Sequence, residues 1–116
     1  MEYDLLLREK GSGTRELFDS AMLTRELVAD PKWESVSTHA LLEAVAQGLG
    51  VSVLPYRLAE PDLASGRLRR VRIADMDLRR KFYIITHKSK YLSEEAQAFL
   101  EEVRGTAAHI PPIPAE

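Results

Sequence analysis

The sequence contains no cysteine, so disulfides, thiolate metal ligands and thiol nucleophiles are all excluded. Histidine is also scarce, with 3 residues in the chain. His39, His87 and His109 lie in separate segments, and none has a second ligand at helical or hairpin spacing. The sequence therefore predicts no metal site.

Charge of one sign is not in excess, and long apolar runs are absent. The 16 basic and 18 acidic residues give a net charge of −2, which leaves no electrostatic footprint for nucleic acid or an anionic membrane. The basic run 67–73 (RLRRVRI) is followed by Asp75 and Asp77, and we interpret it as a solvated strand face. No stretch approaches the roughly 20 apolar residues that span a bilayer. The apolar run near the amino end is too short to be the apolar region of a signal peptide. We therefore expect a soluble chain that contacts neither DNA nor a membrane.

Motifs for nucleotide binding and nucleophilic catalysis are missing as well. The segment 11–13 (GSG) lacks the third glycine of a dinucleotide fingerprint, and no Gly-Lys-Ser/Thr follows it as in a phosphate loop. Ser12 and Ser52 lack the Gly-x-Ser-x-Gly elbow, and no acid and base partners can be assigned to them. We predict no catalytic residue and no cofactor.

The chain does contain an alternation of short apolar runs and amphipathic segments. Its 116 residues are the length of one domain. The order strand, helix, strand, helix, strand is typical of a parallel sheet covered by helices, so we predict the α/β class. The predicted strands are 3–8, 33–36 and 50–55, and the predicted helices run from a cap at Ser12 or Thr14 to 28 and from a cap at Ser37 to Gly48.

The pattern beyond Pro55 predicts further elements and a tail. Residues 56–66 are expected to form one or two helical turns broken at Pro61. The alternating segment 67–73 and the β-branched and aromatic segment 80–88 are predicted strands. Ser93 is expected to cap a helix that runs to about residue 103 and carries four apolar residues on one face. Residues 105–116, with three prolines in the last six, are expected to form an extended or disordered tail.

The two helix starts that follow the first two predicted strands are rich in small and hydroxylated residues. Residues 11–14 (GSGT) open the first helix, and Ser37 and Thr38 open the second. A helix start leaves about four amides unpaired and carries a partial positive charge, so these residues are suited to an anion or a carboxylate. In a parallel sheet both starts lie at the carboxyl ends of the strands, on one edge. Each hydroxyl also has the simpler interpretation of a cap for its own helix.

Four segments of the chain resemble, in order and spacing, the effector-binding domain of LysR-type transcriptional regulators. The resemblance runs from about residue 5 to residue 103, nearly the whole chain. The segments are 5–18 (LLLREKGSGTRELF), 36–55 (VSTHALLEAVAQGLGVSVLP), 63–73 (LASGRLRRVRI) and 80–103 (RKFYIITHKSKYLSEEAQAFLEEV).

The resemblance implies a fold like that of type 2 periplasmic binding proteins. Such a domain has two α/β subdomains, each with helices on both faces of a sheet in three layers, joined by two crossing strands. Residues 1–104 are then the second subdomain, a crossing strand and the C-terminal helix, and 105–116 are the tail. The helix-turn-helix, linker helix and first subdomain are expected to be missing, as in a cloned fragment or a truncated gene product.

The resemblance further implies a cytoplasmic bacterial sensor that binds a small anionic or carboxylate effector between the subdomains, without direct nucleic acid contact by this fragment. Apolar faces of the crossing strand and last helix, which include Phe82, Ile84 and Phe99, would then lack the first subdomain. We therefore expect that the last helix packs in a new position or that the chain forms a homo-oligomer. The ligand-facing positions are Gly11, Ser12, Gly13, Thr14, Ser37, Thr38, Leu54 and Pro55.

Two other classes of function remain open at this point. A solute-binding protein of a transporter would share the fold, and a secretory signal ahead of this segment would favour it over a regulator, which would carry a helix-turn-helix there. A small enzyme or a stand-alone structural module would use the same sheet edge, but no paired acid and base can be found for it.

Overall fold

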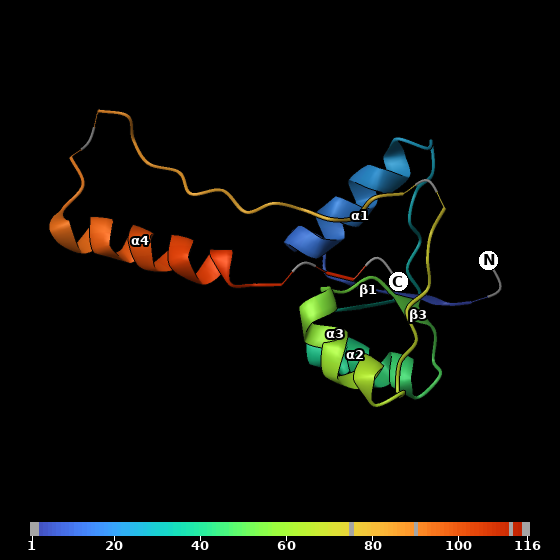
Figure 1. Cartoon of the computed structure of the whole chain (residues 1–116). Coiled ribbons are helices and arrows are strands. Elements are labelled where there is room, and N and C mark those ends of the chain that lie inside the picture. Colours follow the sequence, from blue (N-terminus) through green and yellow to red (C-terminus); the bar gives the residue numbers. More distant parts are fainter. Residues whose placement is uncertain (1–2, 75, 90, 112, 115–116) are drawn as a thin grey trace. The chain divides into compact units, whose positions relative to one another are not determined.

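The computed structural model of the chain describes residues 3–74, 76–89, 91–111 and 113–114. Its contacts divide the chain into two units, Met1–Arg79 and Arg80–Glu116. The first unit contains a sheet and three helices, and the second contains one long helix (Figure 1). Asp75, which follows the predicted basic run, residue 90 of the segment 80–103, and residues 112, 115 and 116 of the predicted tail lie outside the described residues.

The sheet of the first unit is parallel, as predicted. Its three strands stand in the order β2-β1-β3, with Leu6 opposite Trp33 in β2 and Leu5 opposite Val51 in β3. A parallel sheet requires crossover connections, and here the crossovers contain α1 and α2. The strands are β1 (Leu5–Arg8), β2 (Trp33–Ser35) and β3 (Val51–Ser52).

Three of the four helices begin at a serine cap: Ser37 and Ser93 as predicted, and Ser12 rather than the alternative candidate Thr14, which lies inside the first helix. The hydroxyl oxygens of Ser12, Ser37 and Ser93 each accept a hydrogen bond from the amide three residues further on. The fourth helix begins after Pro55, which makes no side-chain cap bond. The helices are α1 (Gly13–Leu23), α2 (Thr38–Ala46), α3 (Tyr56–Ala64) and α4 (Glu94–Ala108).

The apolar run of β1 is buried on both faces of the strand. Leu5 and Leu7 form one cluster with Phe18 of α1, whereas Leu6 forms another with Leu41 and Ala44 of α2. Since successive strand residues point to opposite faces, α1 and α2 contact β1 from opposite sides, as Figure 1 shows. The chain after α3 also returns to the first cluster, where Met76 and Leu78 pack.

At the start of β3 the chain passes so close to the backbone of the segment before β1 that a glycine is required. A Cβ atom placed on Gly50 would clash with the carbonyl oxygen of Asp4. That oxygen accepts a hydrogen bond of 2.9 Å from the amide of Val51, which joins β3 to the segment before β1. Gly50 therefore lets the third strand reach the sheet.

The first helix is shorter than the sequence predicts. It ends at Leu23 rather than at residue 28, because Glu26 has a φ of 58° and reverses the chain. The amide of Leu27 donates to the carbonyl oxygen of Met22 at 3.0 Å, and that of Glu26 donates to Leu23 at 2.9 Å. This is the pattern of a Schellman motif, with glutamate at the position where glycine is usual.

Three other expectations beyond Pro55 are wrong. Pro61 is the sixth of the nine residues of α3, and the helix continues through it to Ala64 with the loss of one amide donor. Residues 67–73 and 80–88 form no strand, because strand structure needs a neighbour and no other strand of the described residues lies beside them. The last helix continues to Ala108, four residues into the segment predicted as tail, because nothing before Pro111 prevents helix formation.

Candidate functional site

Three helix starts lie at the carboxyl edge of the parallel sheet. The strands end at Arg8, Ser35 and Ser52, and each is followed by the start of a helix. Because all strand pairs are parallel, these three ends lie on the same edge. The structure thus brings together the two predicted helix starts, 11–14 and 37–38, and adds the start of α3 beside them.

A tight turn leads from β1 into α1. The amide of Ser12 donates to the carbonyl oxygen of Glu9 at 3.2 Å, and Gly11 adopts a φ of +100°, which favours glycine at this point of the turn. The Ser12 hydroxyl accepts from the amide of Arg15 at 3.0 Å and so caps the helix. Within the part of the chain that the structure describes, the amides of Gly13 and Thr14 have no hydrogen-bond partner.

The start of α2 is built from three hydroxylated residues. The Ser37 hydroxyl accepts from the amide of Ala40 at 3.1 Å, and the Ser37 amide donates to the Ser35 hydroxyl at 3.0 Å. Thr38 uses its hydroxyl oxygen differently, accepting a hydrogen bond of 2.9 Å from Nη1 of Arg8. The hydroxyls of Ser12 and Ser37 are therefore engaged as helix caps, and each satisfies one of the amides that a helix start leaves unpaired.

Two contacts hold the first two helix starts in place relative to each other. The Glu9 amide donates to the carbonyl oxygen of Ser35 at 3.1 Å and extends the pairing of β1 with β2 into the loops. The Arg8 side chain then bridges from β1 to Thr38. The loops at this edge are thus fixed by hydrogen bonds across the strands that precede them.

Arg15 is a buried cation beneath this edge that the sequence analysis missed. It is 3% exposed, although it belongs to the first turn of α1, where a positive charge opposes the helix dipole. Its Nε lies 3.0 Å from an Asp19 oxygen, its Nη1 donates to the Arg8 carbonyl oxygen at 3.0 Å, and its Nη1 lies 3.5 Å from Glu34. An arginine at such an unfavourable helix position was the available sequence signal.

Arg8 is the second residue that the sequence analysis did not assign to the site. Its Nε donates to one Glu9 oxygen at 2.8 Å and its Nη2 to the other at 3.2 Å. This hydrogen bonding lowers the pKa of the Glu9 carboxyl. A cationic side chain that ends the central strand of a parallel sheet was the signal in this case.

The third predicted part of the site, Leu54 and Pro55, lies between β3 and α3. Leu54 packs against the cluster of Leu6, Leu41 and Ala44, so its side chain is engaged in the core. Pro55 directly precedes α3 and has no amide donor. Leu54 is only partly buried, so the two residues present the Leu54 amide, carbonyl oxygens and apolar atoms at this point, but no polar side chain.

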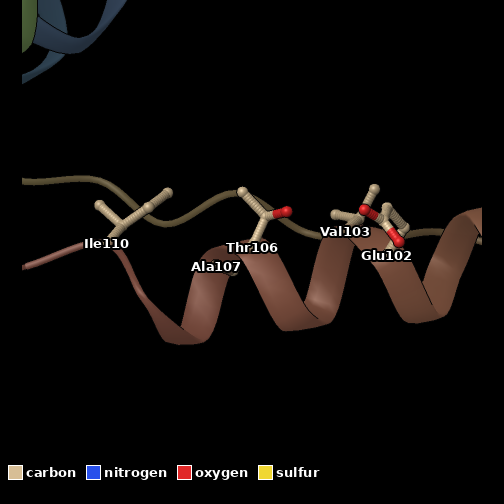
Figure 2. Close-up of a pocket in the computed structure, with 5 residues that line it drawn as sticks. All are labelled: Glu102, Val103, Thr106, Ala107 and Ile110. Carbon is tan, nitrogen blue, oxygen red and sulfur yellow. The ribbon is translucent and has the colours of Figure 1, made fainter.

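Two surface depressions lie elsewhere. One of about 250 Å³ runs along α4 and is lined by Glu102, Val103, Thr106, Ala107 and Ile110, shown in Figure 2. The other, of about 170 Å³, lies beside α1 and the loop after it, and Lys10 and Arg15 are among its lining residues. Neither depression is lined by the eight predicted ligand positions.

Two kinds of feature are absent from the residues that the structure describes. No group of three or more histidine or acidic side chains among them is arranged to hold a metal ion. None of their helices has the length and apolar character needed to cross a membrane.

Comparisons with known proteins point to regulators. The chain is 36% identical over 96 residues to the uncharacterized HTH-type transcriptional regulator YeiE of Escherichia coli K12, covering 83% of the chain and 33% of YeiE. It is 38% identical over 98 residues to the HTH-type transcriptional activator CmpR of Synechocystis, covering 84% and 32%. It is also 34% identical over 108 residues to a protein named phosphonates import ATP-binding protein PhnC of Anaeromyxobacter dehalogenans, covering 90% and 21%.

The chain thus spans about a third of the length of the two regulators and less of the third relative. The family described as LysR substrate binding domain matches residues 1–108, which include all three strands and all four helices. With most of its length matched, this chain belongs to the LysR substrate-binding domain family, whose relatives here include LysR-type transcriptional regulators.

Proposed function

We propose that this chain is the effector-sensing part of a cytoplasmic LysR-type regulator and that it binds a small anion or carboxylate without chemical conversion. The contacts come from the carboxyl edge of the sheet. In this proposal the chain itself makes no contact with DNA. The ligand positions are Gly11, Ser12, Gly13, Thr14, Ser37, Thr38, Leu54 and Pro55.

The observation that carries the proposal is the convergence of helix starts on one edge of the parallel sheet. The amides of Gly13 and Thr14 at the capped start of α1 have no partner among the described residues. The start of α2 lies at the same edge of the sheet, where Thr38 accepts a hydrogen bond from Arg8. Amides at a helix start attract negative charge because of the helix dipole. Glycine at 11 and 13 leaves room for a ligand to approach the backbone.

The fold supports this reading of the edge. In the proposal, unit 1 is the second subdomain of a type 2 periplasmic-binding-protein fold, with α1 and α2 as the outer layers of a three-layer arrangement around the sheet. Its carboxyl edge is then one wall of the cleft between subdomains, where open α/β sheets bind ligands. A ligand held from one wall alone lacks half of its contacts, so we expect weak affinity for isolated anions.

A role as a transporter's solute-binding protein is not favoured. The two regulators that the chain resembles are named as transcriptional regulators, and the matched family is the LysR substrate-binding domain. The relative named as an import protein is an ATP-binding component by its name, and the match covers 21% of it.

The proposal is tested by thermal unfolding in the presence of acetate and of acetamide, which have similar shape and differ in charge. A ligand that binds only the folded chain stabilises it by RT ln(1 + [L]/Kd), so its Tm rises with ligand concentration. We expect acetate to raise Tm above a sodium chloride control of equal ionic strength, and acetamide to leave it unchanged. Equal effects of acetate and acetamide would contradict a site for negative charge.

A further inference from the structure

A guanidinium group lies at the middle of the sheet edge that the proposed function uses. Arg8 is the last residue of β1, which stands between β2 and β3. Its side chain is 21% exposed, so it is largely enclosed but reaches the surface. The Nη1 atom donates to Thr38 Oγ1 at 2.9 Å, while Nε and Nη2 donate to the two carboxylate oxygens of Glu9 at 2.8 and 3.2 Å.

Glu9 is bound to this guanidinium in the manner of a carboxylate ligand. Two roughly parallel N–H to oxygen bonds form the fork geometry by which arginine binds carboxylates and phosphates. The Glu9 side chain is more exposed than that of Arg8, at 36%, and it belongs to the loop between β1 and α1. Its carboxylate can therefore leave the guanidinium without moving a strand or a helix.

The other cation beneath this edge has its own partners. Arg15 is bonded to Asp19 and to the Arg8 carbonyl oxygen, and it lies near Glu34. Glu9 makes no contact with Arg15 among the hydrogen bonds and ion pairs of the described residues. The charge that Glu9 balances is thus that of Arg8.

We infer that Arg8 is the cation that binds the anionic group of the effector and that Glu9 is a resident carboxylate which the effector displaces. The inference rests on the proposed function and adds a charged side chain to a site otherwise composed of amides, hydroxyls and apolar atoms. The bond from Nη1 to Thr38 is retained, so the Nε and Nη2 atoms stay aimed at the ligand. The ligand class is an anion that presents two oxygens to the fork, either a carboxylate or a phosphate.

The test is an NMR titration of the full 116-residue chain with inorganic phosphate and, separately, with acetate, at constant ionic strength. The shifts of the amides of residues 11–14, 37 and 38 report binding at the edge. Wild type is compared with Glu9→Gln, which removes the competing charge, and with Arg8→Gln and Arg8→Lys. The matched controls are Asp77→Asn and Arg79→Gln, because Asp77 and Arg79 form a similar forked pair with exposed side chains.

Glu9→Gln is expected to tighten anion binding about two- to five-fold, the range for loss of a competing exposed ion pair. Arg8→Gln is expected to weaken binding about ten-fold or more, because a charge-assisted bond to the ligand is lost. Arg8→Lys, which keeps the charge but not the fork, should fall between wild type and Arg8→Gln. The two control variants should match wild type. The stronger of the two anions identifies the ligand chemistry as phosphate or carboxylate.

Two contrary outcomes have different meanings. If the edge amides shift with equal affinity in wild type, Glu9→Gln and Arg8→Gln, the inference is overturned and the proposed function stands. If neither anion shifts these amides in any variant, Glu9→Gln included, the anion site itself is wrong and both fall. If Arg8→Gln does not fold, the anion affinity of Glu9→Gln relative to wild type still tests whether the anion displaces Glu9, since Glu9 has no role in the core.

Discussion

The guanidinium of Arg15 donates a hydrogen bond of 3.0 Å to the carbonyl oxygen of Arg8, which joins the first turn of α1 to the end of the central strand. The same side chain pairs with Asp19 one turn later in α1 and lies 3.5 Å from Glu34 of β2. One buried cation thus connects β1, α1 and β2 beside the start of α1.

We expect Arg15→Ala to lower the free energy of unfolding by about 1–3 kcal/mol, the cost of leaving buried hydrogen-bonding groups without a partner. Arg15→Lys should recover part of this loss, because it retains the charge but not the planar fork. Urea unfolding followed by circular dichroism measures both values. An Arg15→Ala variant as stable as wild type would show that the contact is not needed to hold α1 on the sheet.

Gly50→Ala should be among the most damaging single-methyl changes in the chain. The new Cβ would clash with the Asp4 carbonyl oxygen, so β3 would have to move away from β1. We expect a loss of about 2 kcal/mol or more, in the upper range for point mutations. Gly105→Ala is the matched control: nothing lies within 4 Å of its added Cβ, and alanine favours the interior of α4 by roughly 1 kcal/mol. A Gly50→Ala variant that unfolds at the same urea concentration as wild type would contradict the close approach of Gly50 to Asp4, whatever the result for Gly105→Ala.

Ser12→Asp separates the capping role of Ser12 from its proposed place in the ligand site. Aspartate caps helices as well as serine does, so the stability of the chain should stay within about 0.5 kcal/mol of wild type. The added negative charge lies at the start of α1 and should weaken acetate binding severalfold. Ser12→Asn, which caps without a charge, should keep the wild-type affinity. Acetate binding that is unchanged in Ser12→Asp would mean that α1 does not contact the anion.

The pKa of Glu9 provides a check on its ion pair with Arg8. The hydrogen bonds from Arg8 lower it, so the carboxyl is more acidic in the folded chain than in the unfolded chain. A carboxyl with a lowered folded pKa stabilises the fold above its unfolded pKa, and this contribution is lost as pH falls through the folded value. In Arg8→Gln the pKa of Glu9, measured by NMR titration, should rise toward the ordinary glutamate range. The pKa of Asp77, which Arg79 lowers to about 2, should stay where it is, and a general change in both values would contradict a local cause.

The apolar segment 82–85 is expected to drive association between chains. Phe82 and Ile85 are 86% and 88% exposed, and Tyr83 is exposed as well. The described residues in this segment belong to no strand, so their backbone groups are available for pairing with another chain. Sedimentation analysis should show concentration-dependent dimers or larger species that Phe82→Lys combined with Ile85→Lys reduces. A wild-type monomer at high concentration would rule out this association.

Local signals in the sequence predicted local structure well. The caps at Ser12, Ser37 and Ser93 are correct because each depends on a hydrogen bond to an amide three residues away. The alternation of short apolar runs and helices also predicted the parallel sheet, since strands joined by helices pair in parallel. From that sheet, the common edge of residues 11–14 and 37–38 followed directly.

Expectations that depend on distant contacts were less successful. The segment 80–88 has strand-like residues, but no strand forms without a neighbour to pair with. Arg8 and Arg15 were missed because their roles depend on Thr38 and Glu34, which lie far along the chain and approach only in the folded sheet. The end of α1 was misplaced because the sequence carries glutamate at the left-handed position, where a glycine would have marked it.

The most direct test of the central claim is to map where acetate binds, using backbone amide shifts across the whole chain and acetamide as the uncharged control. The account predicts that acetate shifts cluster at residues 11–14 and 37–38, on the two loops beside Arg8, and that acetamide leaves them in place. Shifts concentrated instead on the arginine-rich segment 67–73, or equal for acetate and acetamide, would contradict it.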